Sequence, residues 1–212
     1  MRSNEQVILA NRAWAQELTE QRADYFQRQT GGQRPDFLWI GCSDSRVDPA
    51  VITQSAPGEL FIHRNVANLV HDDDMNLLSA LQFAVETLEV PHIVVCGHYG
   101  CGGLQAALDG NVEGPIATWL ENARCVHANH ADEIDMADDR EMRVNRFVEC
   151  NVRDQLLALA RTPIVQNAFA RGQVLELHGW VYDIRDGLLK PMLEITAATD
   201  LDSVGRPAPV LA

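Results

Sequence analysis

The sequence predicts an α/β domain in which helices flank a mainly parallel central sheet. Short continuous apolar runs, such as 92–97, are typical of strands buried on both faces, as in a parallel sheet. Helical periodicity of apolar residues lies between such runs, for example over 75–89. An Asp-Gly pair at 186–187 joins the runs 174–184 and 188–195, which predicts an antiparallel hairpin at one edge of the sheet.

The chain opens with a long amphipathic helix, predicted over 4–30, because Val7, Trp14 and Leu18 keep one face apolar. Gly31-Gly32 ends it. A helix of this length before the first strand has no obvious partner nearby in the sequence. It packs either on its own domain or on a neighbouring subunit, and the sequence leaves both alternatives open.

Strands and helices then alternate along the chain. We expect further strands at 37–41 and 59–63 and further helices at 102–108, 115–161 with an interruption around 127–139, and 163–171. From 197 onward the sequence has scattered Gly and Pro and no period, which predicts a loosely held tail. The sequence therefore predicts one domain over 1–212, with a helical arm at 1–30 and a C-terminal tail at 197–212.

Composition excludes several classes of function. A net charge of −13 argues against unspecific binding to nucleic acid or to an anionic membrane. No apolar run reaches the roughly 18–20 residues that a membrane-spanning helix needs. The N-terminus lacks the pattern of a secretory signal. Five cysteines, an odd number, fit a reducing compartment better than a disulfide framework, so we expect a cytoplasmic protein.

Two motifs carry metal-binding chemistry. Cys42 directly follows the predicted strand 37–41, while His98 and Cys101 follow the strand 92–97. Ligands bind beyond the carboxyl ends of strands in such sheets, so these three side chains are expected at one edge. Two thiolates and one imidazole leave one position open on a four-coordinate zinc ion, which is the catalytic pattern. The sequence predicts one zinc ion per chain.

Asp44 and Arg46 follow the first of these cysteines. A carboxylate two residues from a ligand can swing onto the metal or away from it, and Arg46 can hold it away by a two-pronged hydrogen bond. Zinc with an open position lowers the pKa of its water to roughly 7. Asp44 off the metal orients the resulting hydroxide, and Asp44 on the metal excludes water. A surface salt bridge in a polar loop is the alternative.

Four motifs together resemble those of the β-class carbonic anhydrases. They are Cys-Ser-Asp-Ser-Arg-Val-Asp-Pro (42–49), His-Arg-Asn-Val-Ala-Asn (63–68), Cys-Gly-His-Tyr-Gly-Cys-Gly-Gly (96–103) and His-Gly-Trp-Val-Tyr-Asp (178–183). The resemblance implies reversible hydration of carbon dioxide to bicarbonate and a proton by zinc-bound hydroxide. It implies Cys42, His98 and Cys101 as zinc ligands, with Asp44 as the fourth in a closed state, and Asp44 with Arg46 as the catalytic pair. It also implies a homodimer or homotetramer in which the N-terminal helix reaches across to its neighbour.

One subgroup of this family is regulated by bicarbonate bound outside the catalytic pocket. Its signature residues are matched here by Trp39, Arg64 and Tyr182, which supply a charge and two ring donors for a small oxyanion. In that subgroup, bicarbonate and low pH both favour the state with Asp44 on zinc. The segment 47–50 departs from the commonest member of the subgroup. The alternative is a packing Trp, a structural Arg and a hairpin Tyr.

The substrate pocket is expected to include four small or apolar residues, namely Val66, Ala67, Gly102 and Gly103. The two glycines allow the backbone to approach the ion and any bound anion closely. His63 and His71 are nearby in sequence and either pass protons or are ordinary surface or satisfied histidines.

Two rival functions fit the same motifs. A related hydrolase would use the same hydroxide on carbon disulfide or carbonyl sulfide, which are linear like carbon dioxide. A non-catalytic, zinc-stabilised anion-binding protein would have four protein ligands and no exchangeable water. The pairing of Asp44 with Arg46 argues against the second rival, because a purely structural site needs no arginine to displace a ligand.

Overall fold

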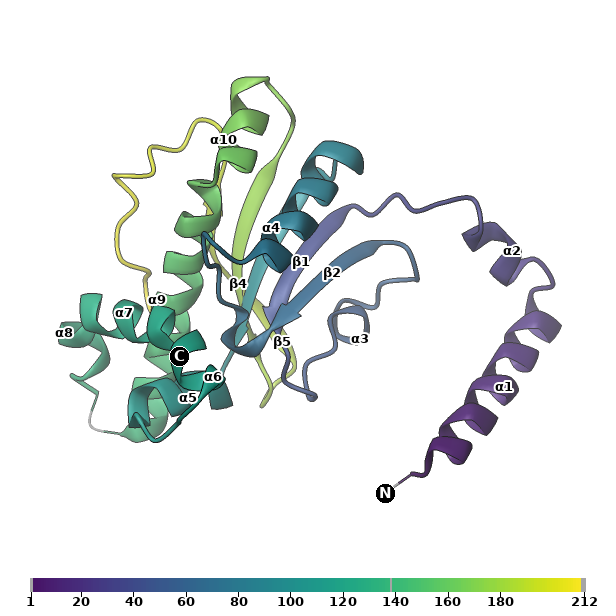
Figure 1. Cartoon of the computed structure of the whole chain (residues 1–212), viewed down its shortest axis with the longest axis horizontal. Coiled ribbons are helices and arrows are strands. Elements are labelled where there is room, and N and C mark those ends of the chain that lie inside the picture. Colours follow the sequence, from purple (N-terminus) through teal and green to yellow (C-terminus); the bar gives the residue numbers. More distant parts are fainter. Residues whose placement is uncertain (1, 138, 211–212) are drawn as a thin grey trace. The chain divides into compact units, whose positions relative to one another are not determined.

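The computed structural model describes residues 2–137 and 139–210. The chain forms two compact units, one ending at Arg34 and the other beginning at Pro35. The second unit confirms the predicted α/β fold, with a mainly parallel sheet, flanking helices and an antiparallel edge (Figure 1). The first unit contains the predicted N-terminal helix.

The described residues form a sheet with the strand order β2-β1-β3-β4-β5. These strands are β1 (Phe37–Cys42), β2 (Leu60–Asn65), β3 (His92–His98), β4 (Glu176–Asp183) and β5 (Leu188–Ile195). The first four run parallel, and β5 pairs antiparallel with β4 through the predicted hairpin. The carboxyl ends of β1 and β3 therefore lie side by side at one edge of the sheet.

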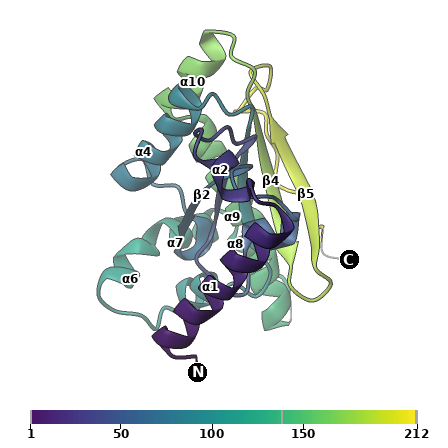
Figure 2. The same ribbon diagram turned by 90° about the vertical axis from the view of Figure 1, so that its right-hand side faces the viewer.

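Three helices cover one face of this sheet (Figures 1 and 2). They are α4 (Met75–Gln82), α9 (Arg140–Ala160) and α10 (Pro163–Ala170). Their apolar side chains pack on those of the strands in one buried cluster, which includes Leu38, Ile40, Leu77, Leu81, Ile93, Val95, Leu156, Val165 and Leu177. Removal of this apolar surface from water is the main stabilising term for the layered arrangement.

Shorter helices surround the carboxyl edge of the sheet. They are α3 (Pro49–Thr53), the 3-10 turn η1 (Val66–Asn68), α5 (Gly102–Asp109), α6 (Pro115–Trp119), α7 (Glu121–Asn129) and α8 (Ala131–Ile134). A second buried cluster, with Leu104, Leu120, Ile134 and Phe147, fixes several of these helices against α9. The predicted helix over 75–89 is α-helical only to Gln82 and continues as the π-helical turn η2 (Phe83–Thr87).

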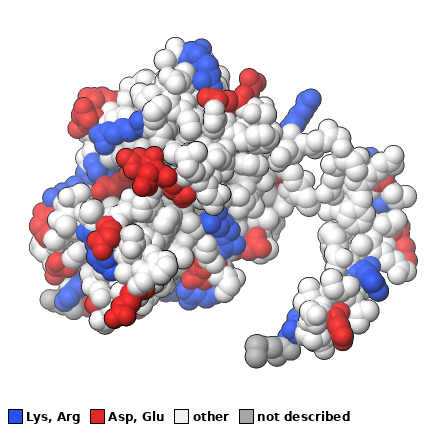
Figure 3. All heavy atoms as spheres, viewed as in Figure 1, with Lys and Arg blue, Asp and Glu red and all other residues white. Residues whose placement is uncertain are grey.

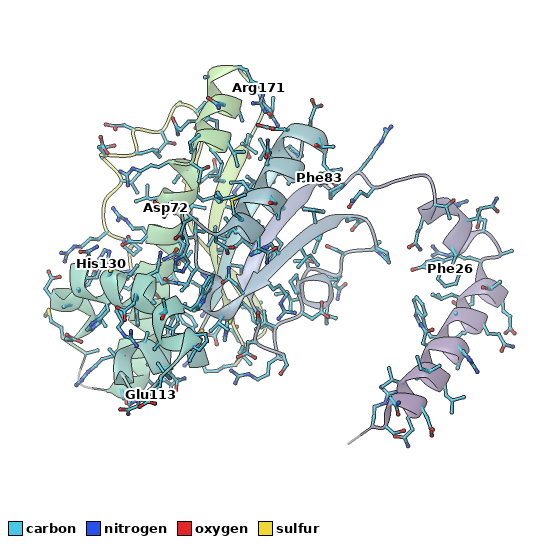
Figure 4. All side chains as sticks on the ribbon, in the orientation of Figure 1. Phe26, Asp72, Phe83, Glu113, His130 and Arg171 are labelled. Atoms are coloured by element: carbon cyan, nitrogen blue, oxygen red, sulfur yellow. The ribbon has the colours of Figure 1, made fainter. Side chains whose placement is uncertain are left out.

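The N-terminal arm differs from the prediction of one helix over 4–30. It contains α1 (Asn4–Gln21), which begins at a capping box formed by Ser3 and Gln6, and a separate short helix, α2 (Tyr25–Gln29). Phe26, labelled in Figure 4, lies on α2 and meets the ring of Trp14 edge-on, with 5.6 Å between centroids. In one straight helix these residues would be about 18 Å apart, so this apolar contact requires the break between the two helices.

The C-terminal tail is held more firmly than the sequence predicts. Three arginines donate hydrogen bonds to backbone carbonyls of the tail. Arg146 bonds to Pro207, Arg153 to Val204 and Gly205, and Arg161 to Leu201. Arg161 also pairs with Asp202 at 2.9 Å. The expectation of a loose tail was wrong because tail carbonyls are acceptors whose partners lie far away in the sequence.

The surface carries both signs of charge. On the face shown in Figure 3, acidic and basic side chains are interspersed, and the described residues there form no continuous basic surface. Among the described residues, none of the helices is both long and apolar enough to cross a membrane.

Gly97 provides a test of the packing of β3 against α9. A methyl group at this position would lie 2.6 Å from Cγ2 of Val152, a branched side chain with little freedom to move. We expect Gly97→Ala to lower the free energy of unfolding by about 1–3 kcal/mol in chemical denaturation of the metal-free protein. Gly31→Ala is the control, because its added methyl group meets nothing within 4 Å. Equal stability of the two variants would contradict this packing.

Candidate metal centre

Backbone pairing places the three predicted ligands together. In the parallel register of β1 and β3, Gly41 lies opposite Cys96, so Cys42 ends one strand close to where His98 ends the other. The chain then turns through Gly100, whose φ of 66° lies in the left-handed region that favours glycine. Cys101 follows as the N-cap residue of α5.

The geometry of this cluster fits a tetrahedral ion. The ligand atoms of Cys42, His98 and Cys101 all lie within 4.8 Å of one another, and the three residues are at most 6% exposed. The two sulfur atoms are 3.9 Å apart. Two Zn–S bonds of about 2.3 Å at a tetrahedral angle would place their sulfur atoms about 3.8 Å apart. The sulfur spacing therefore matches zinc without rearrangement.

The imidazole of His98 is oriented for a metal. Its Nδ1 lies 3.1 Å from the carbonyl oxygen of Tyr99, which can only accept, so the proton is on Nδ1. Its Nε2 is buried and has no hydrogen-bond partner in the part of the chain that the structure describes. A buried nitrogen with an unused lone pair is costly unless something binds it. A carbonyl partner behind a metal-binding histidine is the usual arrangement.

The two thiols have unequal acidity. The hydrogen bond from Cys101 lowers the pKa of Cys42 to about 4, against the opposing effect of burial. The same hydrogen bond, together with burial, raises the pKa of Cys101 well above its ordinary value. One thiolate is therefore present at neutral pH before any ion arrives, and this charge favours capture of a cation.

Asp44 and Arg46 face this cluster. Arg46 donates from Nε to Oδ1 at 2.9 Å and from Nη2 to Oδ2 at 2.7 Å, and its backbone N–H also donates to Oδ1. These bonds hold the pKa of Asp44 well below its usual range, so the carboxylate is ionised at neutral pH. Oδ2 of Asp44 is also 3.6 Å from Nε2 of His98. The carboxylate thus lies within reach of both the arginine and the metal position.

A row of buried polar side chains on α9 supports the site, and sequence reasoning missed it. Asn145 accepts from the backbone N–H of Gly100 at 3.1 Å, and Glu149 accepts from the hydroxyl of Tyr99 at 2.8 Å. Asn151 donates to the carbonyl of Ala67 at 3.1 Å. The sequence did contain a signal for this support, because polar residues interrupt the apolar face of a long helix. Polar groups buried in this way need hydrogen-bond partners.

The predicted pocket residues come from the turn η1 and the first turn of α5. Ala67 is buried and has a φ of 67°, which is strained for a residue with a side chain. A methyl group on Gly103 would lie 2.8 Å from Val66 and 3.2 Å from Ala67, so these three residues are in contact. Gly102 has no neighbour within 4 Å of such a methyl group and is not part of this contact.

The three candidate anion-binding residues lie on one face of the sheet. Trp39 and Tyr182 share a small apolar cluster, and Nε1 of Trp39 is buried with no partner among the described residues. The guanidinium of Arg64 already makes hydrogen bonds within the chain. It donates to the carbonyl oxygens of Cys42, Asp44 and Val47 at 2.8, 2.6 and 2.6 Å, so it ties β2 to the loop that carries Asp44.

The two histidines considered for proton transfer lie beside a hollow of about 440 Å³ that includes His63, Val66 and Trp119 in its lining. His63 is buried, and this burial lowers its pKa. His71 stacks on Trp119, with 4.3 Å between ring centroids. Among the hydrogen bonds that the structure describes, none joins either histidine to Cys42, His98 or Cys101.

Fold and site together define an α/β protein with three candidate metal ligands at the carboxyl edge of its sheet. The family model for carbonic anhydrase matches residues 37–189. A carbonic anhydrase of Emericella nidulans is 40% identical over 190 residues, which span 90% of this chain and 83% of that protein.

Solved structures that resemble this chain are also carbonic anhydrases, of the β class. The β-carbonic anhydrase of Coccomyxa, determined with acetazolamide, has a TM-score of 0.87 and 39% identity, with 92% of this chain and 89% of that chain covered. A tetrameric β-carbonic anhydrase of Sordaria macrospora has a TM-score of 0.83 and 41% identity, with 87% and 94% covered. The chain therefore belongs to the β-class carbonic anhydrases, a family of enzymes.

The metal centre is tested by metal content. We expect Cys42→Ser and Cys101→Ser each to weaken zinc binding by more than about 100-fold, because changes outside the ligand shell alone cost 10- to 100-fold. Elemental analysis after gel filtration measures the zinc retained. Cys125→Ser is the matched control, because Cys125 is an exposed thiol outside the cluster. Full zinc retention in either ligand variant would contradict the assignment.

Proposed function

We propose that this chain catalyses the reversible hydration of carbon dioxide to bicarbonate and a proton, with one zinc ion held by Cys42, His98 and Cys101. The observation that carries the proposal is that three buried ligand atoms converge while Asp44, held by Arg46, faces the remaining side. Zinc in such a centre acidifies water, so that a nucleophile is available near neutral pH.

Asp44 is the residue proposed to orient the attacking group. Its carboxylate is ionised and can accept a hydrogen bond from water at the open position, which fixes the direction of the remaining lone pair. Arg46 restrains it with two side-chain hydrogen bonds. In a closed state Asp44 would release Arg46 and itself supply the fourth ligand, which would exclude water. The distance of 3.6 Å between Asp44 and His98 makes this a small movement.

Val66 and Ala67 are proposed to form the wall against which carbon dioxide rests. The substrate is linear and has no net dipole, so an apolar surface suits it better than a polar one. Gly103 allows this wall to approach α5, because any side chain there would collide with Val66. Trp119 donates to the carbonyl of Val66 at 2.8 Å and Asn151 to that of Ala67, which holds the strained loop in place.

Replacement of Asp44 tests the catalytic role. We expect Asp44→Asn to lower kcat for carbon dioxide hydration by about 100-fold, since positioned proton acceptors contribute 10²–10⁴-fold, while zinc stays bound. Stopped-flow hydration with a pH indicator measures the rate, and elemental analysis measures the metal. Asp48→Asn is the control in the same loop, because Asp48 caps α3 and asparagine caps equally well. An unchanged kcat in Asp44→Asn would refute the role.

Regulation by bicarbonate is proposed to act through Arg64. This side chain donates to the carbonyl of Asp44, and the indole N–H of Trp39 is buried without a partner among the described residues. An oxyanion that accepts from Trp39, Arg64 and Tyr182 competes with the loop carbonyls for the guanidinium. Release of the loop then frees Asp44 to move onto the metal, which links bicarbonate binding to the closed state.

Trp39→Phe tests this regulation, because it keeps an apolar ring and removes the indole donor. We expect inhibition of carbon dioxide hydration by added bicarbonate to weaken, with the inhibition constant rising about tenfold, which corresponds to about 1.4 kcal/mol for one hydrogen bond to a charged group. Trp180→Phe is the control, because Trp180 packs edge-on against Trp39 in the same cluster. Equal inhibition of the wild type and Trp39→Phe would exclude the pocket.

The functional unit is proposed to be a homodimer or homotetramer in the cytoplasm. On α1, Val7, Ile8, Leu9 and Trp14 are 47–62% exposed, and none of the described residues of this helix is buried. Apolar side chains in such number on one helix are typical of an interface between subunits. The five cysteines are unpaired, which suits a reducing compartment.

A further inference from the structure

A second group of metal-binding side chains lies at the amino end of the sheet. His92 is the first residue of β3, and the register places Glu176, the first residue of β4, directly opposite. His178 lies two residues further along β4 and therefore faces the same side of the sheet as Glu176. His92 and His98 are the two ends of β3, so this group is about 20 Å from the metal centre.

The three ligand atoms form a triangle of the size that a metal ion requires. Nδ1 of His92 is 3.2 Å from Nε2 of His178 and 3.4 Å from Oε2 of Glu176. Nε2 of His178 is 3.9 Å from the same oxygen. Bonds of about 2.0–2.1 Å at tetrahedral angles place ligand atoms about 3.3–3.4 Å apart. The two distances from Nδ1 of His92 match this value. The distance from His178 to Glu176 is longer, and a rotation of the glutamate side chain would shorten it.

The surroundings leave the three ligands accessible. The side chains of His92, Glu176 and His178 are 32%, 41% and 13% exposed, so an ion can reach them. Nδ1 of His178, on the far side of the ring, lies 3.8 Å from the carboxylate of Glu194. At this distance the carboxylate makes no hydrogen bond to the ring, but its negative charge favours a cation bound nearby.

Another group of possible metal ligands differs because its carboxylate is already paired with an arginine. His130, labelled in Figure 4, lies near Glu133 and Cys150. Arg146 donates to the carboxylate of Glu133 from two nitrogens, and Nη1 of the same arginine pairs with Glu149. Arg146 already neutralises the carboxylate of Glu133, so this group is part of an ion-pair network. No arginine or lysine bonds to His92, Glu176 or His178 in the contacts that the structure describes.

We propose that His92, Glu176 and His178 form a second metal site, for Zn²⁺ or a divalent ion with the same preference for imidazole and carboxylate. The ion replaces the proton shared between the two imidazoles and joins the amino ends of β3 and β4. It leaves at least one coordination position open to solvent. The site is independent of the proposed catalytic function, because its ligands lie at the opposite end of the sheet.

Metal titration of the loaded enzyme tests the proposal. The protein is first brought to one zinc ion per chain and then titrated with Zn²⁺ by calorimetry. We expect one further ion per chain, with an affinity at least about tenfold lower in His178→Gln and in Glu176→Gln. Glu176→Gln keeps the shape of a partly exposed side chain, so it decides the question even where His178→Gln perturbs folding. His127→Gln is the control, because His127 also pairs with a carboxylate, Asp135, but belongs to none of the candidate metal groups among the described residues.

Titration with Co²⁺ identifies the ligands of the added ion. The proposed site gives the visible bands of cobalt bound by nitrogen and oxygen, without the thiolate charge-transfer band that a site with two cysteines produces. No further ion, equal affinity in both variants and the wild type, or a thiolate band from the added ion would each overturn the proposal.

Discussion

Backbone pairing between β1 and β3 is the interaction on which the site depends. The parallel register aligns Gly41 with Cys96, so the last residue of each strand brings a proposed metal ligand to the same edge. A shift of one residue would turn every side chain of one strand to the other face and separate Cys42 from His98. In this register Leu38, Ile40, Ile93 and Val95 are buried in the cluster that α4, α9 and α10 complete. The stability of the core and the geometry of the ligands are therefore set by one arrangement.

The loops at this edge are held by groups that lie far away in the sequence. Side chains of α9 bond to the loop after β3 at Gly100 and to the turn η1 at Ala67, where the backbone is strained. Arg64 ties β2 to three carbonyls of the loop that contains Asp44. The proposed ligands and the carboxylate are thus positioned before an ion or substrate arrives, which would reduce the free-energy cost of binding either. Under the proposed regulation, the bonds from Arg64 to this loop would transmit anion binding to Asp44.

Much of this architecture could be predicted from the sequence, and the exceptions share one cause. Continuous apolar runs and helical periodicity are local signals, and they predicted the strands, the hairpin and the edge where Cys42 and His98 meet. The break in the arm depends on Trp14 meeting Phe26, and the hold on the tail depends on arginines of α9. The support from Asn145 likewise appears only when the helix is packed. Contacts between distant residues leave no periodic signal, so sequence patterns alone could not place them.

Zinc K-edge X-ray absorption on protein loaded with one zinc equivalent per chain tests the central claim most directly. Thiolates of Cys42 and Cys101 bind zinc more tightly than imidazole and carboxylate alone, so one equivalent reports on this centre. We expect two sulfur neighbours at about 2.3 Å and two lighter neighbours, nitrogen or oxygen, at about 2.0–2.1 Å. Four sulfur neighbours, or none, would contradict a centre built from two cysteines, His98 and one exchangeable position.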